Sequence, residues 1–187
     1  KQFISAMAGS LGFVLLCVTV VGVVFAPAIV KLFAPGFATQ GPRFDLAVTM
    51  LRITFPYLML ISLTAFSGAI LNTYSRFWVA AFTPVFLNLC MISAAIWLAP
   101  SMAVPITGLA WGVFIAGVAQ MLFQWPFLKK MSLMPRPRIN FKDPGVKKVL
   151  KLMVPALFGV SVSQINLLLD TIFASFLVVG SVSWLYY

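Results

Sequence analysis

Long runs of apolar residues, separated by short polar segments, divide the chain into five stretches. They cover residues 6–33, 46–74, 77–98, 104–128 and 152–179. Each run is long enough for one crossing, because the hydrocarbon core of a bilayer needs about 20 apolar residues per helix. Only a helix satisfies every backbone group within one segment in lipid, and the runs lack the alternation of a membrane β-barrel. The pattern predicts an all-α, polytopic membrane protein with five transmembrane helices.

The composition supports a membrane location. Hydrophobic residues make up 62% of the chain and charged residues 9%, with a mean hydropathy of +1.07, whereas water-soluble domains are about 45–50% apolar. The two cysteines, Cys17 and Cys90, lie in separate apolar runs, where a free thiol behaves as a small hydrophobe. A structural disulfide is therefore not expected. A metal site is not expected either, because the chain has only these two cysteines and no histidine.

Charge is distributed unevenly along the chain. Residues 77–128 contain no Asp, Glu, Lys or Arg, and residues 129–151 then contain eight Lys and Arg and a single acid, Asp143. A dense basic loop beside a crossing is normally retained in the cytoplasm. The net charge of +10 alone could indicate nucleic-acid binding. Because apolar helices flank the basic loop, anionic membrane lipids are the expected counter-charge, and no nucleic-acid partner is predicted.

The same charges predict the orientation. If the loop 129–151 is cytoplasmic, so are Lys1 and the turn 72–76, which contains Arg76. Lys1, Arg76 and the eight loop cations give ten on that side, against three on the other: Lys31, Arg43 and Arg52. The positive-inside rule therefore places the Lys1 end and the loop Lys129 to Lys151 in the cytoplasm.

The basic loop has two parts. Residues 131–144 hold Pro135, Pro137 and Pro144 between charged residues, which predicts an extended connector. Residues 146–153 place three lysines on one helical face, which predicts a short amphipathic lead-in within the headgroup layer before the fifth crossing turns into the bilayer. The chain would then divide into four crossings (1–128), a basic connector that serves as a hinge or boundary (129–151), and a fifth crossing with the start of another helix (152–187).

Prolines lie inside or near the ends of the crossings, at Pro27, Pro56, Pro84, Pro126 and Pro155. A proline within a helix removes a backbone hydrogen bond and kinks the helix. Such breaks are common where helices line a cavity or bend during transport, but proline is also more frequent in membrane helices in general. The sequence leaves both interpretations open.

Small residues recur at four-residue spacing in the fourth run, at Gly108, Gly112 and Ala116. Such a stripe suits close helix contact, because small side chains allow two backbones to approach. Packing is its predicted role.

Asp170 is the only carboxylate within a predicted crossing. Ser163 and Asn166 precede it by seven and four residues and share its helical face. An ionised carboxylate in hydrocarbon is costly, so these three side chains are candidates to hold Na⁺ or to relay a proton. Alternatively, Asp170 is hydrated near the outer boundary, since about 27 Å of helix rise separates it from Leu152.

Arg52 lies one or two turns into the second crossing. A guanidinium that faces an internal cavity would bind phosphate in a bidentate manner, which makes Arg52 a candidate for the substrate cavity. Near the boundary, the same side chain would instead extend to the headgroups of the outer leaflet.

The sequence gives little support to enzyme chemistry. It has no histidine, no pair of carboxylates within the membrane, no glycine-rich phosphate loop and no metal-ligand cluster. Translocation or binding is the favoured class of function.

Several segments resemble the MviN/MurJ family of lipid II flippases, within the multidrug/oligosaccharidyl-lipid/polysaccharide exporter superfamily. The matching segments are APGF at 34–37, ITFPYLMLISLTAFSGAILNTYSRF at 53–77, AAFTPVFLNL at 80–89, PRINF at 137–141, SVSQINLLLDTIFASFL at 161–177 and GSVSWLYY at 180–187. They cover most of the chain in the order that the family has them.

The resemblance implies that the chain is an internal fragment holding the third to seventh of fourteen transmembrane helices. In the family, two lobes of six helices surround a cavity with alternating access, so the connector would join the lobes. The implied substrate is lipid II, an undecaprenyl-pyrophosphate-linked muropeptide, moved from the inner to the outer leaflet of the bacterial cytoplasmic membrane. Ser183 would border the cavity, and Asp170 occupies a position where some members have an acid suited to a coupling cation.

Two alternatives stay open at this point. One is a related exporter of drugs or of another polysaccharide lipid. The other is a non-transporting scaffold that holds cell-wall synthesis proteins together. No cofactor is expected beyond coupling to Na⁺ or protons.

Overall fold

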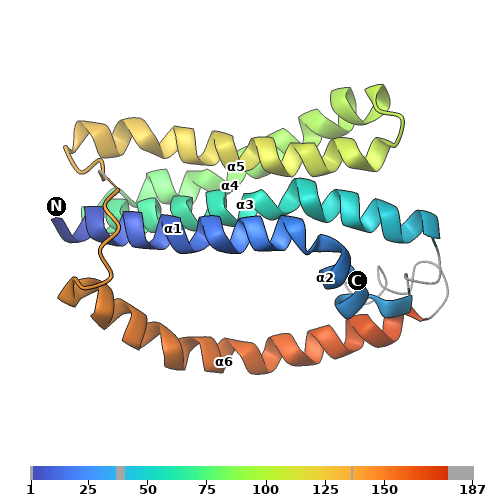
Figure 1. Ribbon diagram of the computed structural model, residues 1–187. Coiled ribbons are helices and arrows are strands. Elements are labelled where there is room, and N and C mark those ends of the chain that lie inside the picture. The colour runs from blue at the N-terminus through green and yellow to red at the C-terminus, as the bar shows by residue number, and fades with distance from the viewer. Residues whose placement is uncertain (1, 37–40, 136, 177–187) are drawn as a thin grey trace.

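The structure of the chain, a computed structural model, consists of helices in the described residues 2–36, 41–135 and 137–176, with the side chains of residues 163 and 175 left out of the description. The elements are α1 (Gln2–Val24), α2 (Ala26–Phe33), α3 (Gly41–Thr73), α4 (Phe77–Ser93), a π-helical segment (Ala94–Leu98), a 3-10 turn (Ala99–Ser101), α5 (Pro105–Lys130) and α6 (Pro144–Ser175). Helices α1, α3, α4 and α5 form a bundle, and α6 runs along one side of it (Figure 1). The predicted all-α class is confirmed, and within the described residues five helices are long and apolar enough to cross a membrane.

The first predicted crossing, residues 6–33, is wrong as a single helix. α1 ends at Val24, and a separate helix α2 follows after a turn at Phe25. Pro27 lies in the first turn of α2 and has no backbone N–H to donate to the preceding turn, which favours an interruption at this point. Figure 1 shows α2 turning away from the line of α1 toward α6.

Two serines in the left-handed conformation end α3 and α5 in the same way. Ser75 has φ 60° and Ser132 has φ 54°. The residue after each serine then closes the helix end: the Arg76 N–H donates to the Leu71 carbonyl at 2.9 Å, and the Leu133 N–H donates to the Leu128 carbonyl at 3.0 Å. These bonds satisfy carbonyls that the last helical turn leaves free, so both helices end sharply on the same side of the bundle.

The stripe of small residues on α5 packs as predicted. A Cβ added to Gly108 would lie 2.8 Å from the Ala99 Cα, and one added to Gly112 would lie 2.6 Å from the Ala94 Cβ. Real Cβ atoms do not approach that closely, so only glycine allows α5 to contact the π-helical segment and the 3-10 turn at the end of α4. Trp78 and Phe123 add an edge-to-face contact nearer the other end of this helix pair.

α6 starts earlier than the sequence predicts. Residues 146–153 are helical, as predicted, but α6 is continuous from Pro144, so this lead-in belongs to the same helix as the predicted fifth crossing. The Asp143 carboxylate accepts hydrogen bonds from Gly145 N at 2.8 Å and Val146 N at 3.3 Å. This cap starts the helix eight residues before the predicted boundary at Leu152.

The connector packs along the first half of α1. The Arg138 N–H donates to the Ser5 carbonyl at 3.1 Å, and the Asn140 N–H donates to the Ser10 hydroxyl at 3.2 Å. Phe141 contacts the Phe13 ring edge-to-face, with the ring centroids 6.4 Å apart. The connector is therefore extended, as predicted, and is held to the bundle by backbone hydrogen bonds.

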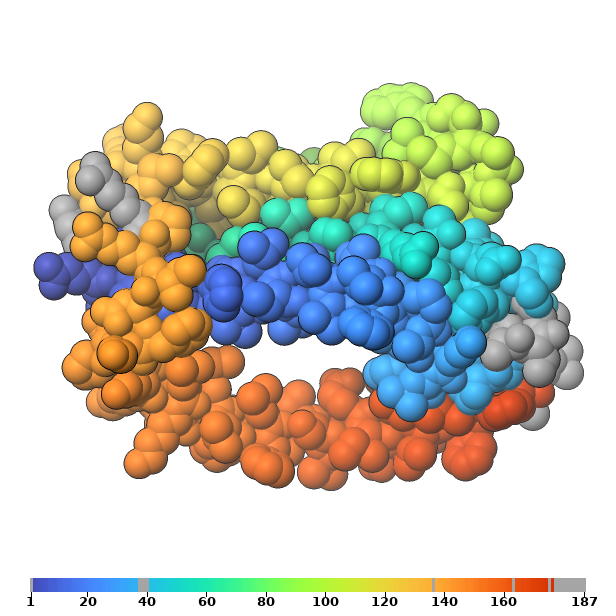
Figure 2. Space-filling model, in the orientation of Figure 1, coloured from blue at the N-terminus to red at the C-terminus, as the bar shows by residue number. Residues whose placement is uncertain are grey.

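α6 contacts the other described helices only at its two ends. Near its start, Val146 is buried against Ala6 and Met7 of α1, and its far end contacts α2. The residues between these contacts are mostly exposed, and Figure 2 shows an opening between α1 and the middle of α6. α6 is thus separated from the bundle over most of its length.

Candidate functional site

The three candidate cation ligands predicted from the sequence all lie on α6. Asn166 and Asp170 lie one turn apart on α6, and both are exposed. Ser163 lies one turn earlier in the same helix, and its side chain is outside the description. The structure thus places a carboxylate and an amide in a row on α6. Within the described residues, α1 and α2 are the helices that contact α6.

Of the two substrate-cavity candidates, the structure describes only Arg52, and it is not brought together with that row. Arg52 is exposed on α3, which does not contact α6 within the described residues. Ser183 lies outside the described residues. The substrate-cavity and cation roles of all five residues therefore stay predictions.

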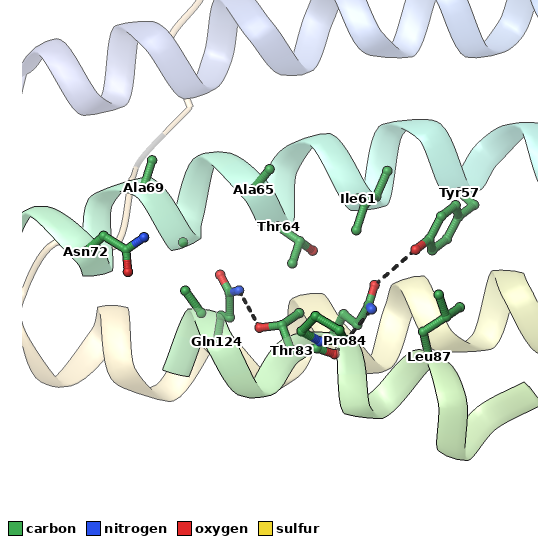
Figure 3. Close-up of a pocket in the computed structure, with 13 residues that line it drawn as sticks. Tyr57, Ile61, Thr64, Ala65, Ala69, Asn72, Thr83, Pro84, Leu87 and Gln124 are labelled. Carbon is green, nitrogen blue, oxygen red and sulfur yellow. Dashed lines mark hydrogen bonds between the residues drawn. The ribbon is translucent and has the colours of Figure 1, made fainter. Parts of the chain in front are cut away.

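A second set of polar side chains lies inside the bundle, and the sequence did not predict that they come together. The set joins α3, α4 and α5 through hydrogen bonds that Figure 3 marks in part. The Gln124 Nε2 donates to the Thr83 Oγ1 at 2.9 Å, and the Gln120 Nε2 donates to the Thr83 carbonyl at 3.3 Å. The Tyr57 hydroxyl contacts the Gln120 Oε1 at 3.5 Å. We call Tyr57, Thr64, Thr83, Gln120 and Gln124 the interhelix polar cluster.

Two members of the cluster keep an unpaired oxygen. Thr64 and Gln124 are each 2% exposed, and neither the Thr64 Oγ1 nor the Gln124 Oε1 has a hydrogen-bond partner. Leaving a buried polar group unpaired costs about 1–3 kcal/mol, so buried oxygens of this kind usually find a partner. Both residues line a cavity of about 440 Å³ between α3, α4 and α5.

A sequence signal for the cluster exists in the spacing of α5. Gln120 and Gln124 continue the stripe of Gly108, Gly112 and Ala116 at the same four-residue interval. One ridge of α5 therefore carries small residues where it meets the end of α4 and amides where it meets the middle of α3 and the first half of α4. The stripe predicted from the sequence ends at Ala116 and therefore does not include Gln120 and Gln124.

An apolar cavity of about 600 Å³ lies on the other side of α3, between α1, α3 and α5. Gly12, Leu63 and Trp125 are among its lining residues, and Pro135 and Ile139 of the connector close one end. Because its lining is almost entirely apolar, this cavity suits hydrocarbon and offers no chemistry for a charged headgroup.

The connector end of the bundle carries a strong positive charge. Lys129, Lys130, Arg138, Lys142, Lys147, Lys148 and Lys151 are all exposed there. The acid among them, Asp143, caps α6 through its carboxylate, so its charge lies against the helix N-terminus. The surface at this end therefore favours anions such as lipid phosphates.

Comparison with known proteins identifies the family. The family model described as "Lipid II flippase MurJ" matches residues 1–187. A "Probable lipid II flippase MurJ" of Haemophilus influenzae is 50% identical over 194 residues, and one of Vibrio cholerae is 51% identical over 194 residues. A "Lipid II flippase MurJ" of Burkholderia cenocepacia is 45% identical over 191 residues.

These alignments cover 100% of the chain and 38%, 37% and 37% of the three relatives. The chain thus spans little more than a third of the length of the relatives it matches. The family match covers the bundle, the connector and α6. The chain belongs to the MurJ family of lipid II flippases.

Proposed function

We propose that the protein to which this chain belongs flips lipid II from the inner to the outer leaflet of the bacterial cytoplasmic membrane. The observation that carries the proposal is the family match over all 187 residues, together with relatives named as lipid II flippases at 45–51% identity. Five helices long and apolar enough to span a membrane agree with this activity.

The separation of α6 from the bundle supports a division into two lobes. α1 to α5 pack on one another, whereas α6 contacts only α1 and α2 within the described residues. In the proposed arrangement, residues 1–128 are four crossings of the first lobe, and α6 begins the second lobe. The connector is the boundary, and rocking of the lobes about it exposes a central cavity to each side in turn.

The exposed basic residues of the connector support the proposed orientation. With ten cations on one side of the membrane and three on the other, the connector lies in the cytoplasm, where anionic lipids and lipid II are collected. Moving the anionic diphosphate head outward is then favoured by the membrane potential, by about 2.3 kcal/mol per charge for each 100 mV. A polar, cationic route lowers the cost of desolvating that head, and Arg52 and Ser183 are the proposed contributions of this chain.

Asp170 and Asn166 are the proposed coupling-ion residues, with Ser163 as a third candidate. A carboxylate and an amide one turn apart are hard oxygen ligands, which fit Na⁺ in kind. Asp170 and Asn166 lie on one helix and form only part of a site, so the remaining ligands would come from other helices. When bound, the cation would neutralise Asp170 and lower the cost of placing this carboxylate in the membrane.

A depletion experiment tests the proposed function. Cells that depend on the full-length protein are depleted of it, and the lipid II in each leaflet is measured by an assay that modifies only the outer leaflet. Lipid II should accumulate in the inner leaflet, and expression of the full-length protein should restore export. Normal export in the absence of a second flippase would contradict the proposal. A scaffold for cell-wall enzymes would instead leave export intact and reduce polymerisation.

A further inference from the structure

The cavity in the interhelix polar cluster contains two hydrogen-bonding groups that the protein leaves unused. The Thr83 hydroxyl donates to the Val79 carbonyl at 2.9 Å and accepts from the Gln124 Nε2, so it is already occupied. The two oxygens without a partner are the Thr64 Oγ1 and the Gln124 Oε1. Both belong to side chains that line the cavity and are almost completely buried.

The chemistry of these two oxygens restricts the ligand. An amide oxygen only accepts hydrogen bonds, so the ligand must donate to Gln124, whereas the Thr64 hydroxyl can donate or accept. None of the residues that line the cavity carries a charge, and many are apolar, including Ile61, Pro84 and Leu87. A neutral ligand that donates a hydrogen bond to Gln124, and donates to or accepts from Thr64, therefore fits this cavity. Water meets this requirement, and about 30 Å³ per molecule leaves room for several in a cavity of about 440 Å³.

The cavity has a polar residue at the connector end of the bundle. Asn72, in the last turn of α3, is exposed and lines the same cavity. Figure 3 shows its side chain at one end of the row, with Thr64 and Gln124 farther in. Thr64 lies eight residues before Asn72, which is about 12 Å along the helix. The unused oxygens are thus two turns or so from a polar end, within reach of a short file of water molecules.

We propose that this cavity is a water-binding site, filled from the connector end at Asn72, in which ordered water hydrogen-bonds to the Thr64 Oγ1 and the Gln124 Oε1. The water completes the polar contacts between α3, α4 and α5 inside the first lobe. This places hydration between α3, α4 and α5, in a cavity that is open toward the exposed Ala65, Ala69 and Pro84. The inference is independent of the proposed transport activity.

Cysteine accessibility in the full-length protein tests the proposal. Cys17 and Cys90 are first replaced by alanine, and Thr64→Cys, Asn72→Cys and Leu71→Cys are introduced one at a time. A membrane-impermeant methanethiosulfonate, which reacts with thiols in contact with water, is added to membrane vesicles of either orientation. Leu71 is the matched control, because it is closer to the helix end than Thr64 but is fully buried in the apolar core. Gly68→Cys replaces Thr64→Cys if that variant does not fold, because Gly68 is buried in the same cavity lining and a Cβ added there would meet no atom closer than 3.5 Å.

The expected result is that Thr64→Cys is labelled from the same side as Asn72→Cys and faster than Leu71→Cys, at equal rates in sodium and choline buffers. Labelling of Thr64→Cys no faster than Leu71→Cys would overturn the proposal. Protection by sodium alone would also overturn it, because the cavity would then be a cation site. If Asn72→Cys and Thr64→Cys are both labelled from the periplasmic side, the proposed orientation fails and the water site stands.

Discussion

Gly9 of α1 lies directly against the backbone of Arg138 in the connector. A Cβ added to Gly9 would overlap that backbone, 2.5 Å from the Arg138 nitrogen. The close approach allows the Arg138 N–H to reach the Ser5 carbonyl at 3.1 Å. Glycine at this position thus fixes how closely the connector packs on the bundle.

Gly9→Ala should therefore displace the connector and destabilise the protein, since forcing an extra carbon into a packed site costs about 1–3 kcal/mol. The measurement is the midpoint of thermal unfolding of the purified full-length protein, together with the rate of tryptic cleavage at Lys142. Gly12→Ala is the matched control, because a Cβ at Gly12 meets nothing within 4 Å and alanine favours the helix. Equal midpoints for the two variants would contradict the assigned contact.

Thr83→Val should destabilise the interhelix polar cluster. The substitution keeps the shape of the side chain but removes the acceptor of the Gln124 Nε2, which leaves a buried donor unpaired at a cost of about 1–3 kcal/mol. Thr73→Val is the control, because the exposed Thr73 hydroxyl donates only to the Ala69 carbonyl of its own helix. The thermal unfolding midpoint should fall for Thr83→Val and stay within error for Thr73→Val, and equal values would contradict the assigned role.

Val146→Ala should loosen the start of α6. Val146 is 1% exposed and packs on Ala6 and Met7, so losing two buried carbons costs about 1.5 kcal/mol at about 0.8 kcal/mol each. Faster tryptic cleavage at Lys147 and Lys148 is the expected result. Leu150→Ala, at a half-exposed position one turn later, should leave the cleavage rate nearly unchanged. The contact with α1 would be of no consequence if both variants were cleaved at the wild-type rate.

Asp170→Ala should reduce lipid II export by the full-length protein more than Leu169→Ala. Both side chains are exposed in this structure, but only the first removes a carboxylate from the membrane-spanning segment. Any stabilisation of the protein by Na⁺, measured as a rise in the unfolding midpoint, should disappear in Asp170→Ala and persist in Leu169→Ala. Equal export by the two variants would leave Asp170 as a hydrated residue at the boundary.

The sequence predicted the number of long helices because hydrophobic length alone determines which segments can cross a bilayer. It did not predict where α1 ends, because residues 25–33 continue the apolar run with Lys31 as their one charged residue, and only local geometry at Phe25 and Pro27 separates the two helices. It also placed the start of α6 at Leu152, since a polar first turn capped by Asp143 adds no hydrophobic signal.

The polar contacts were harder to predict for a different reason. Gln124 and Thr83 are 41 residues apart, and Tyr57 and Gln120 are 63 apart, so their pairing depends on how three helices are rotated against one another. When a helix is apolar on every side, hydropathy does not show which side packs against the neighbouring helices. In α5, the four-residue spacing of small residues and amides is the one sequence feature that fixes the packed face.

The attachment of α6 at its two ends has a consequence for biosynthesis. The residues of α1 and α2 that α6 and the connector contact are synthesised before them, and large proteins fold unit by unit as the chain emerges. Ser5, Gly9 and Ser10 can therefore capture the connector as soon as it is made and hold α6 beside the finished bundle. The bundle of α1, α3, α4 and α5 would then act as an intramolecular guide for the placement of α6.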